Sequence, residues 1–222
     1  MNLANTKLAL GDLEEGWKKY ELSLNSKWRK EYEYQEETRW NGENDKVVCV
    51  YGEQGLGDEI YFCDAIPDLV KDAKAVHIDC DARLVRLFKR SFPAAHVHGT
   101  RRDTCLEWLD TVTLDHRVAM GSLPKFYRNK PSDFSKKPYL KADPEMVRMW
   151  KEHFKSFGKP VIGICSQGGT VKNNIGGRTI TEEQWKPFIE SHDAVYISLD
   201  YKGRSEEHTS ELQSHLNLVC RL

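Results

Sequence analysis

The first part of the chain has the hydrophobic spacing of two short helices. Between residues 3 and 22 the apolar side chains recur at steps of three and four residues, and Gly11-Asp12 interrupts them. This pattern predicts a helical hairpin. Residues 26–45 are charged and aromatic, and they predict a connector that lies on a domain surface.

From residue 46 onward, short β-branched runs alternate with stretches of helical spacing. Val47–Tyr51 predicts a buried strand, and the glycine-rich stretch 52–58 predicts a loop. The elements expected after this loop are a helix at 59–72, a strand at 75–79, a helix at 82–90, and strands at 94–98 and 111–114. This alternation predicts an α/β fold with a parallel, Rossmann-like sheet.

The same pattern then begins again. Asp143-Pro144 predicts the start of a helix at 146–157, followed by a strand at 161–165 and a polar, glycine-rich loop at 166–178. Thr181 and Gln184 form a capping-box pattern for a helix through Glu190, and a strand is expected at 194–199. The predicted organisation is a hairpin (1–25), a connector (26–45), a complete Rossmann-like domain (46–142) and the start of a second one (143–203).

The composition argues against several classes of protein. The 222 residues include 33 Lys and Arg against 34 Asp and Glu, a formal net charge of −1, so no overall basic field favours nucleic acid. No apolar run reaches the roughly 20 residues of a membrane span, and no signal sequence is evident. The six cysteines lack CxxC spacing, which favours reduced and mostly buried thiols. We expect a cytoplasmic protein with no membrane span and no nucleic-acid partner.

Residues 204–222 differ in character from the rest. The stretch Arg-Ser-Glu-Glu-His-Thr-Ser-Glu-Leu-Gln-Ser-His, which begins at Arg204, resembles the in-frame translation of a sequencing-library adapter. A polar C-terminal helix is the alternative interpretation. We treat this stretch as an artefact tail and exclude it from functional argument. On this interpretation the natural protein is expected to continue beyond Gly203, and the chain is a fragment.

Two glycine-rich loops are the candidate ligand-binding elements. Each follows a predicted strand, and open α/β sheets bind ligands at the carboxyl ends of their strands. The first loop, Gly-x-x-Gly-x-Gly-Asp, matches neither the dinucleotide fingerprint nor the Walker loop, which disfavours dehydrogenases and ATPases. Its glycines would let the backbone approach a ligand. Asp58 then has two interpretations: an N-cap carboxylate, or a base that accepts a proton from an acceptor hydroxyl.

Several motifs between residues 3 and 203 together resemble a known family. The stretch Gly52-Glu53-Gln54-Gly55-Leu56-Gly57-Asp58-Glu59 follows a hairpin with Gly16-Trp17 that resembles the last unit of a tetratricopeptide array. It precedes Met120-Gly121-Ser122-Leu123-Pro124 and Pro138-Tyr139-Leu140-Lys141-Ala142-Asp143-Pro144. This combination resembles bacterial tetratricopeptide proteins that carry a GT-B glycosyltransferase region related to family 9, the heptosyltransferase-like enzymes.

The resemblance implies transfer of a sugar from a nucleotide-sugar donor to a hydroxyl of a glycan or protein acceptor. It implies two Rossmann-like domains, the first for the acceptor and the second for the donor, with no metal and no cofactor besides the substrate. Asp58 matches the aspartate of the family's Gly-Asp motif and becomes the candidate base, with Gly55 and Gly57 close to the transferred sugar. The groups expected to hold the donor diphosphate are Ser166, Gly168, Gly169, Lys172 and Arg178.

The chain departs from the family pattern in its second loop. Related sequences often have Trp-Ala-Gly-Asn-Pro near that strand end, where this chain has Cys165-Ser166-Gln167-Gly168-Gly169. The later strands of the second domain, which carry most nucleotide contacts in the family, are absent from the sequence given. We therefore expect the chain by itself to be inactive.

Two other functions stay open. The first is a scaffold that binds a protein partner through tetratricopeptide-like repeats and carries a degenerate transferase domain. The second is an epimerase of the same architecture. His96-x-His98 places two imidazoles on one strand face, but no third ligand has zinc-site spacing, so strand-edge histidines are expected. His116 is expected either to pack or to reach the cleft, and the connector's aromatics either to attach the hairpin or to line a sugar site.

Overall fold

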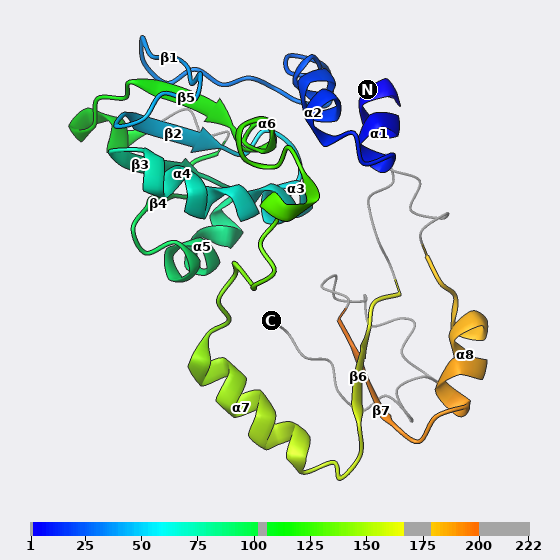
Figure 1. Cartoon of the computed structure of the whole chain (residues 1–222). Coiled ribbons are helices and arrows are strands. Elements are labelled where there is room, and N and C mark those ends of the chain that lie inside the picture. Colours follow the sequence, from blue (N-terminus) through cyan, green and yellow to red (C-terminus); the bar gives the residue numbers. More distant parts are fainter. Residues whose placement is uncertain (1, 102–105, 167–178, 200–222) are drawn as a thin grey trace. The chain divides into compact units, whose positions relative to one another are not determined.

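The structure is a computed structural model that describes residues 2–101, 106–166 and 179–199. The chain divides into two compact units, Met1–Asp143 and Pro144–Leu222. Strands and helices alternate in both (Figure 1). The α/β class expected from the hydrophobic pattern is therefore confirmed.

Five parallel strands form the sheet of the first unit, in the order β1-β5-β2-β3-β4. They are β1 (Thr38–Arg39), β2 (Val47–Tyr51), β3 (Ala75–Asp79), β4 (His96–His98) and β5 (His116–Ala119). The chain passes from β2 to β3 and β4 on one side, and then returns to the other side of β2 for β5. The strand order thus reverses between β2 and β5. Open α/β sheets bind ligands at such a reversal.

The helices that connect these strands are shorter than expected. One helix was expected at 59–72, but the structure has α3 (Leu56–Phe62), a 3-10 turn η1 (Cys63–Ala65) and α4 (Ile66–Asp72). Pro67 lies in the first turn of α4, where it has no N–H to continue the hydrogen-bond ladder. The remaining elements of this unit are η2 (Ala82–Leu84), α5 (Val85–Ser91), η3 (Glu107–Thr111), η4 (Met120–Ser122), α6 (Pro124–Tyr127) and η5 (Pro131–Asp133).

The prediction of a strand at 111–114 was wrong. The structure ends a 3-10 helix at Thr111 and places the strand at His116–Ala119. The backbone of the predicted segment bonds instead to the side-chain amide of Gln35, with distances of 2.8 and 3.0 Å. The true strand contains the buried Arg117, so its hydrophobic pattern is interrupted by a charge.

The predicted helical hairpin is present as α1 (Asn2–Ala9) and α2 (Leu13–Glu21). The rings of Trp17 and Tyr20 on α2 both pack against Phe62 of α3, with centroids 6.3 and 5.8 Å apart. Trp17 Nε1 also donates to the carbonyl of Arg128 at 2.8 Å. The hairpin therefore buries an aromatic face on the α/β layer.

The connector at 26–45 is built into the domain, although the sequence predicted that it lies on the surface. It supplies the edge strand β1, which pairs with β5. Trp40 is 5% exposed, and its ring lies 4.5 Å from that of Phe126. Arg29 is fully buried.

Arg29 forms a buried ion pair that joins several segments. Its Nε donates to Glu53 Oε1 at 3.0 Å, in the loop after β2. Its Nη1 donates to the carbonyl of Tyr20 at 3.1 Å, and its Nη2 donates to Ser122 Oγ at 2.8 Å in the loop after β5. One guanidinium group thus holds the hairpin and the two loops that flank the strand reversal.

The β4 edge of the sheet carries a group of stacked rings. His77 Nδ1 and His98 Nε2 are 3.1 Å apart, and the two ring planes differ by 2°. Trp108 stacks on His98 with a centroid distance of 4.1 Å. Burial, together with the neighbouring imidazoles, lowers the pKa of both His77 and His98 to about 4.

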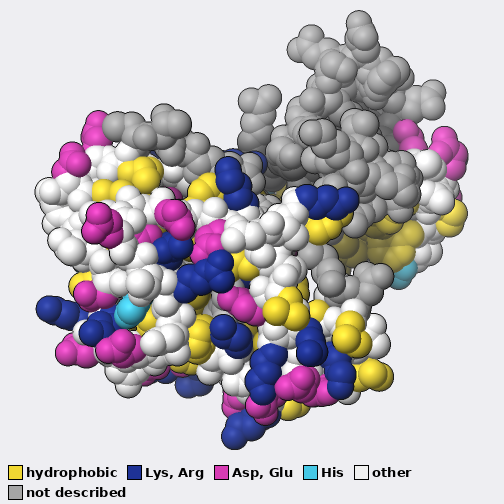
Figure 2. Space-filling model, turned by 90° about the horizontal axis from the view of Figure 1, so that it is seen from above, with side chains coloured by type: hydrophobic (Ala, Val, Ile, Leu, Met, Phe, Trp, Pro, Cys, Tyr) yellow, Lys and Arg dark blue, Asp and Glu magenta, His cyan; other side chains and the backbone are white. Residues whose placement is uncertain are grey.

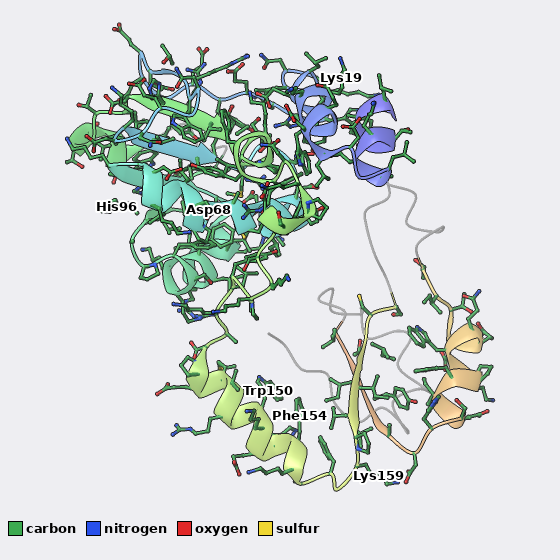
Figure 3. All side chains as sticks on the ribbon, viewed as in Figure 1. Lys19, Asp68, His96, Trp150, Phe154 and Lys159 are labelled. Atoms are coloured by element: carbon green, nitrogen blue, oxygen red, sulfur yellow. The ribbon has the colours of Figure 1, made fainter. Side chains whose placement is uncertain are left out.

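The second unit has two described strands and two described helices. These are α7 (Pro144–Lys155), β6 (Val161–Ile164), α8 (Glu182–Glu190) and β7 (Val195–Ser198), and β6 pairs in parallel with β7. The predicted capping box is confirmed, since Thr181 N donates to Gln184 Oε1 at 2.9 Å and Gln184 N to Thr181 Oγ1 at 3.4 Å. Trp150 and Phe154 stack on one side of α7 (Figure 3).

Neither the surface charges nor the cysteines of the described residues form a distinct site. Basic and acidic side chains are interspersed over the face shown in Figure 2. Cys49, Cys63 and Cys80 are buried free thiols, whereas Cys165 is exposed. Among the described residues, no helix has both the length and the apolar character needed to cross a bilayer.

We predict that Arg29→Met lowers the free energy of unfolding by about 3–5 kcal/mol, because it leaves the buried Glu53 carboxylate without its cation. Urea unfolding measures the effect. The matched control is Arg39→Met, which removes an arginine that is 57% exposed from its pair with Glu31 and should cost about 1 kcal/mol or less. Equal losses in the two variants would contradict the assignment.

We also predict that acid destabilises the protein through the His77–His98 pair. In the unfolded chain both histidines have a pKa near 6.5, so between pH 6.5 and 4 the unfolded state binds protons that the folded state does not. Stability should therefore fall as the pH is lowered through this window. His98→Gln should make the slope shallower, by about 1–2 kcal/mol over the window, because the rings are only partly shielded from solvent. Parallel curves for the two proteins between pH 4 and 6.5 would contradict this cause.

Candidate functional site

The candidate site lies at the strand reversal, where the loops after β2 and β5 meet. The backbone N–H of Gly121, after β5, donates to Glu53 Oε1, after β2, at 3.2 Å. Glu53 is 6% exposed. A buried carboxylate therefore joins the two loops across the position where a ligand of this sheet type is expected.

The three glycines of the first loop have three different roles, so the expectation that all of them approach a ligand needs correction. A Cβ on Gly52 would lie 2.4 Å from Glu59 Cδ, so this glycine makes room for a buried carboxylate. Gly55 is the N-cap residue of α3, in extended conformation. A Cβ on Gly57 would meet nothing within 4 Å. Gly57 alone borders open space.

Asp58 is the third residue of α3, not its N-cap as the sequence suggested. Its Oδ2 accepts from the N–H of Gly55 at 2.9 Å, which closes the helix start as in a capping box. The residue is exposed. Within the described part of the chain, Oδ1 accepts no hydrogen bond, so one carboxylate oxygen of this exposed residue is open to solvent beside Gly57.

A second buried carboxylate beneath this loop was missed by sequence reasoning. Glu59 is 1% exposed; its Oε2 accepts from Asp81 N at 2.9 Å, and its Oε1 lies 2.8 Å from Arg101 Nη1. Arg101 also donates to the carbonyl of Gln54 at 2.5 Å and pairs with Asp81 at 3.0 Å. The loops after β2, β3 and β4 are therefore tied together. The available signal was a charge within the apolar stripe 59, 62, 63, 66 of the helix.

Burial places Glu59 close to its titration point at neutral pH. Removal from water, helped by the nearby Asp81 and Glu53 charges, raises its pKa to about 7. The Asp81 N–H and the Arg101 guanidinium act in the opposite direction, because they stabilise the carboxylate. Glu59 is too deeply buried to reach a substrate, so its part in the site is to hold the loop.

The donor-loop prediction lies mostly outside the described residues. Ser166 is described, and its carbonyl accepts from Ile180 N at 3.0 Å. Gly168, Gly169, Lys172 and Arg178 lie outside the described residues. The structure therefore places Gly55, Gly57 and Asp58 together, on the first unit only.

The histidines noted in the sequence do not join this site. His116 is the first residue of β5, at the end of the sheet opposite to the loops, and its Nδ1 lies 2.9 Å from Thr38 Oγ1. His96 and His98 belong to the ring stack on β4. In residues 2–101, 106–166 and 179–199, no group of three or more His, Cys, Asp or Glu side chains has an arrangement that could hold a metal ion.

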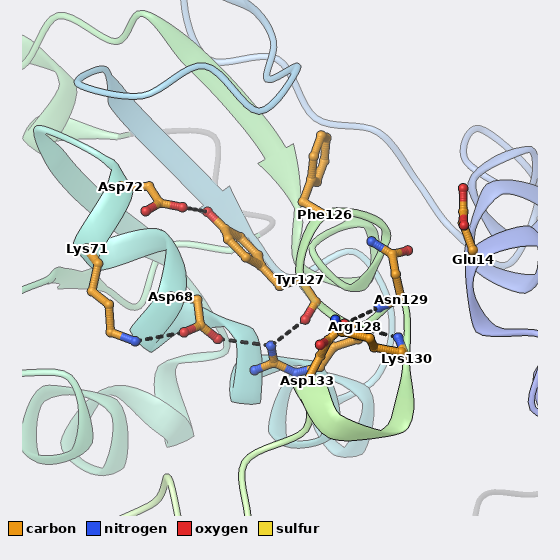
Figure 4. A pocket seen from close by; sticks show the side chains of 10 residues that line it. All are labelled: Glu14, Asp68, Lys71, Asp72, Phe126, Tyr127, Arg128, Asn129, Lys130 and Asp133. Carbon is orange, nitrogen blue, oxygen red and sulfur yellow. Dashed lines mark hydrogen bonds and ion pairs between the residues drawn. The ribbon is translucent and has the colours of Figure 1, made fainter.

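A shallow groove of about 750 Å³ lies elsewhere on the first unit, between α2, α4 and α6 (Figure 4). Several of its polar groups are already paired: Asp68 with Lys71 and Arg128, and Asp72 with the Tyr127 hydroxyl, which donates to it at 2.9 Å. No residue of the 52–59 loop lines it. We therefore place the candidate site at the strand reversal, where an exposed carboxylate has an open side.

Comparison with known proteins gives one distant likeness. The chain is 28% identical to Protein FlbA of Caulobacter vibrioides (strain ATCC 19089 / CIP 103742 / CB 15), over 92% of this chain and 37% of that protein. The chain thus spans little more than a third of that relative's length. No family model matches the chain. No solved structure matches it either.

We predict that Gly52→Ala and Gly57→Ala differ sharply in stability. The Gly52 variant should lose about 1–3 kcal/mol, because Glu59 cannot move away without breaking its bonds to Asp81 and Arg101. In the Gly57 variant the added methyl group has free space on α3, so the free energy of unfolding should be unchanged or should rise by about 0.5–1 kcal/mol. Thermal and urea unfolding measure both. The roles given to these glycines fail if the order is reversed.

Proposed function

We propose that the first unit is the acceptor-binding domain of a metal-independent GT-B glycosyltransferase related to family 9, and that the hairpin is a tetratricopeptide-like unit. The second unit would begin the domain that binds the nucleotide sugar. A cytoplasmic location, expected from the sequence, is part of this proposal. The observation that carries the proposal is Asp58, an exposed carboxylate at the reversal of a parallel sheet, on a loop held by two buried carboxylates.

In the proposed reaction an acceptor hydroxyl of a glycan or protein attacks the anomeric carbon of the donor sugar. The new C–O bond forms as the bond to the nucleotide diphosphate breaks, and the diphosphate leaves with the bonding electrons. Asp58 takes the hydroxyl proton. Attack from the side opposite the leaving group inverts the anomeric configuration. Ser166, Gly168, Gly169, Lys172 and Arg178 are proposed to stabilise the departing diphosphate.

The local geometry suits Asp58 to this task. Oδ2 is fixed by the Gly55 N–H, which orients the carboxylate, while Oδ1 stays open to an incoming hydroxyl. Gly57 has no side chain to obstruct that approach, and a Cβ there would meet nothing within 4 Å. A base needs this combination, because it must come within hydrogen-bond distance of a proton on a bulky substrate.

One observation favours a non-catalytic scaffold as the second candidate. The bond from Gly55 N to Asp58 is sufficient to explain an aspartate at this position without any catalysis. In that case the hairpin would bind a protein partner and the α/β layers would serve as its support.

Asp58→Asn in the full-length protein separates the two candidates. Asparagine retains an oxygen that can accept from Gly55 N–H, so stability should change by about 0.5 kcal/mol or less, but it cannot take a proton. Transfer from a nucleotide sugar should fall by about 100-fold or more while nucleotide binding is kept. The exposed Asp110→Asn is the matched control and should transfer normally. Unchanged turnover by the Asp58 variant removes Asp58 from the reaction. A full-length protein that neither transfers sugar nor binds nucleotide supports the scaffold.

A further inference from the structure

We propose that Tyr20 and Arg29, from the hairpin and the connector, are positioning residues for the loop that carries Asp58. The inference rests on the proposed function, since it concerns the same candidate base. It gives the hairpin a part in the reaction itself, beyond any role in binding a partner.

Tyr20 reaches the loop directly. Its hydroxyl donates to Gln54 Oε1 at 3.1 Å, and its ring is 8% exposed. Gln54 Nε2 donates in turn to Glu53 Oε1 at 3.1 Å, and the Gln54 carbonyl accepts from Arg101. Gln54 is therefore fixed from three directions, and one of them is the second helix of the hairpin.

Arg29 completes the same connection from the connector. Its guanidinium lies 4.5 Å above the Tyr20 ring and donates to the Tyr20 carbonyl, so it is oriented by the hairpin. From this position it donates to Glu53 and to Ser122. Loss of the hairpin's docked position would remove the support of Arg29, and with it the cation that holds the Glu53 end of the loop.

The far end of the segment is held by the hairpin as well. Phe62, the last residue of α3, packs against the rings of both Trp17 and Tyr20. Asp58 lies between these two anchors, on a helix that begins at Leu56 and ends at Phe62. The position of its carboxylate thus depends on hairpin contacts at both ends of the segment 53–62.

This dependence matters because proton transfer is sensitive to position. A base must lie about 2.6–3.2 Å from the atom it deprotonates, and a displacement of about 1 Å can lower a rate by roughly 100-fold. A molecule that binds the hairpin and shifts its docking would therefore also move this loop. By linkage, a ligand bound at the loop would change the affinity of the hairpin for that molecule by the same factor as the molecule changes the affinity of the loop for the ligand.

The test compares Tyr20→Phe with Tyr127→Phe in the full-length protein. Each variant removes one hydroxyl that donates to a single side chain: Gln54 for Tyr20, and Asp72 for Tyr127, outside the loop. Tyr20→Phe should lower kcat about tenfold with KM for the nucleotide sugar unchanged, and amide exchange in segment 52–62 should be several times faster. Tyr127→Phe should change neither quantity.

A double variant checks that the effect passes through Gln54. Gln54→Leu should lower kcat to a similar extent, and adding Tyr20→Phe to it should produce little further loss, because the shared contact is already gone. Additive losses, or equal kcat and equal exchange in the two tyrosine variants, overturn the inference. Amide exchange needs no turnover, so it decides the positioning role even if Asp58→Asn shows that the proposed reaction is wrong.

Discussion

The buried pair of Arg29 and Glu53 is the interaction on which the arrangement of the first unit depends. Removing two charges from water is unfavourable, and it is offset only when every donor and acceptor of the pair finds a partner. Here those partners come from the hairpin, the connector, the loop after β2 and the loop after β5. The pair keeps all of these hydrogen bonds only when the four segments are in place together, so we expect the segments to assemble as one cooperative unit.

Glu59, six residues further along the chain, repeats this construction. Its bonds to Asp81 and Arg101 join the loops after β3 and β4, as Glu53 joins those after β2 and β5. Each carboxylate occupies space left by a glycine, Gly121 for Glu53 and Gly52 for Glu59. Much of what looks like a ligand-binding motif is therefore internal structure, and Gly57 with Asp58 is the part that faces outward.

The sequence was sufficient for elements whose signal is local. The hairpin, the strands at 47–51 and 75–79, and the Thr181 capping box follow from spacing and cap chemistry, and all are present. It was insufficient where a charge enters a core through a distant partner. The buried charge of Arg117 interrupts the apolar pattern of β5, so the sequence did not predict this strand. The pairing of Glu59 with Arg101 requires two loops that only the folded sheet brings together. The placement of Asp58 in the segment that follows β2 was predictable, but its bond to Gly55 was not, because that bond depends on where α3 begins.

The two edges of the five-stranded sheet bear on association between molecules. β1 has two residues and β4 has three, whereas the inner strands β2 and β3 have five each. An edge strand exposes unpaired backbone groups in proportion to its length, and long edges invite pairing with other chains. With such short edges, this sheet offers little template for adding a foreign strand, so self-association through continued β-pairing, including amyloid-like growth, is disfavoured at this part of the molecule.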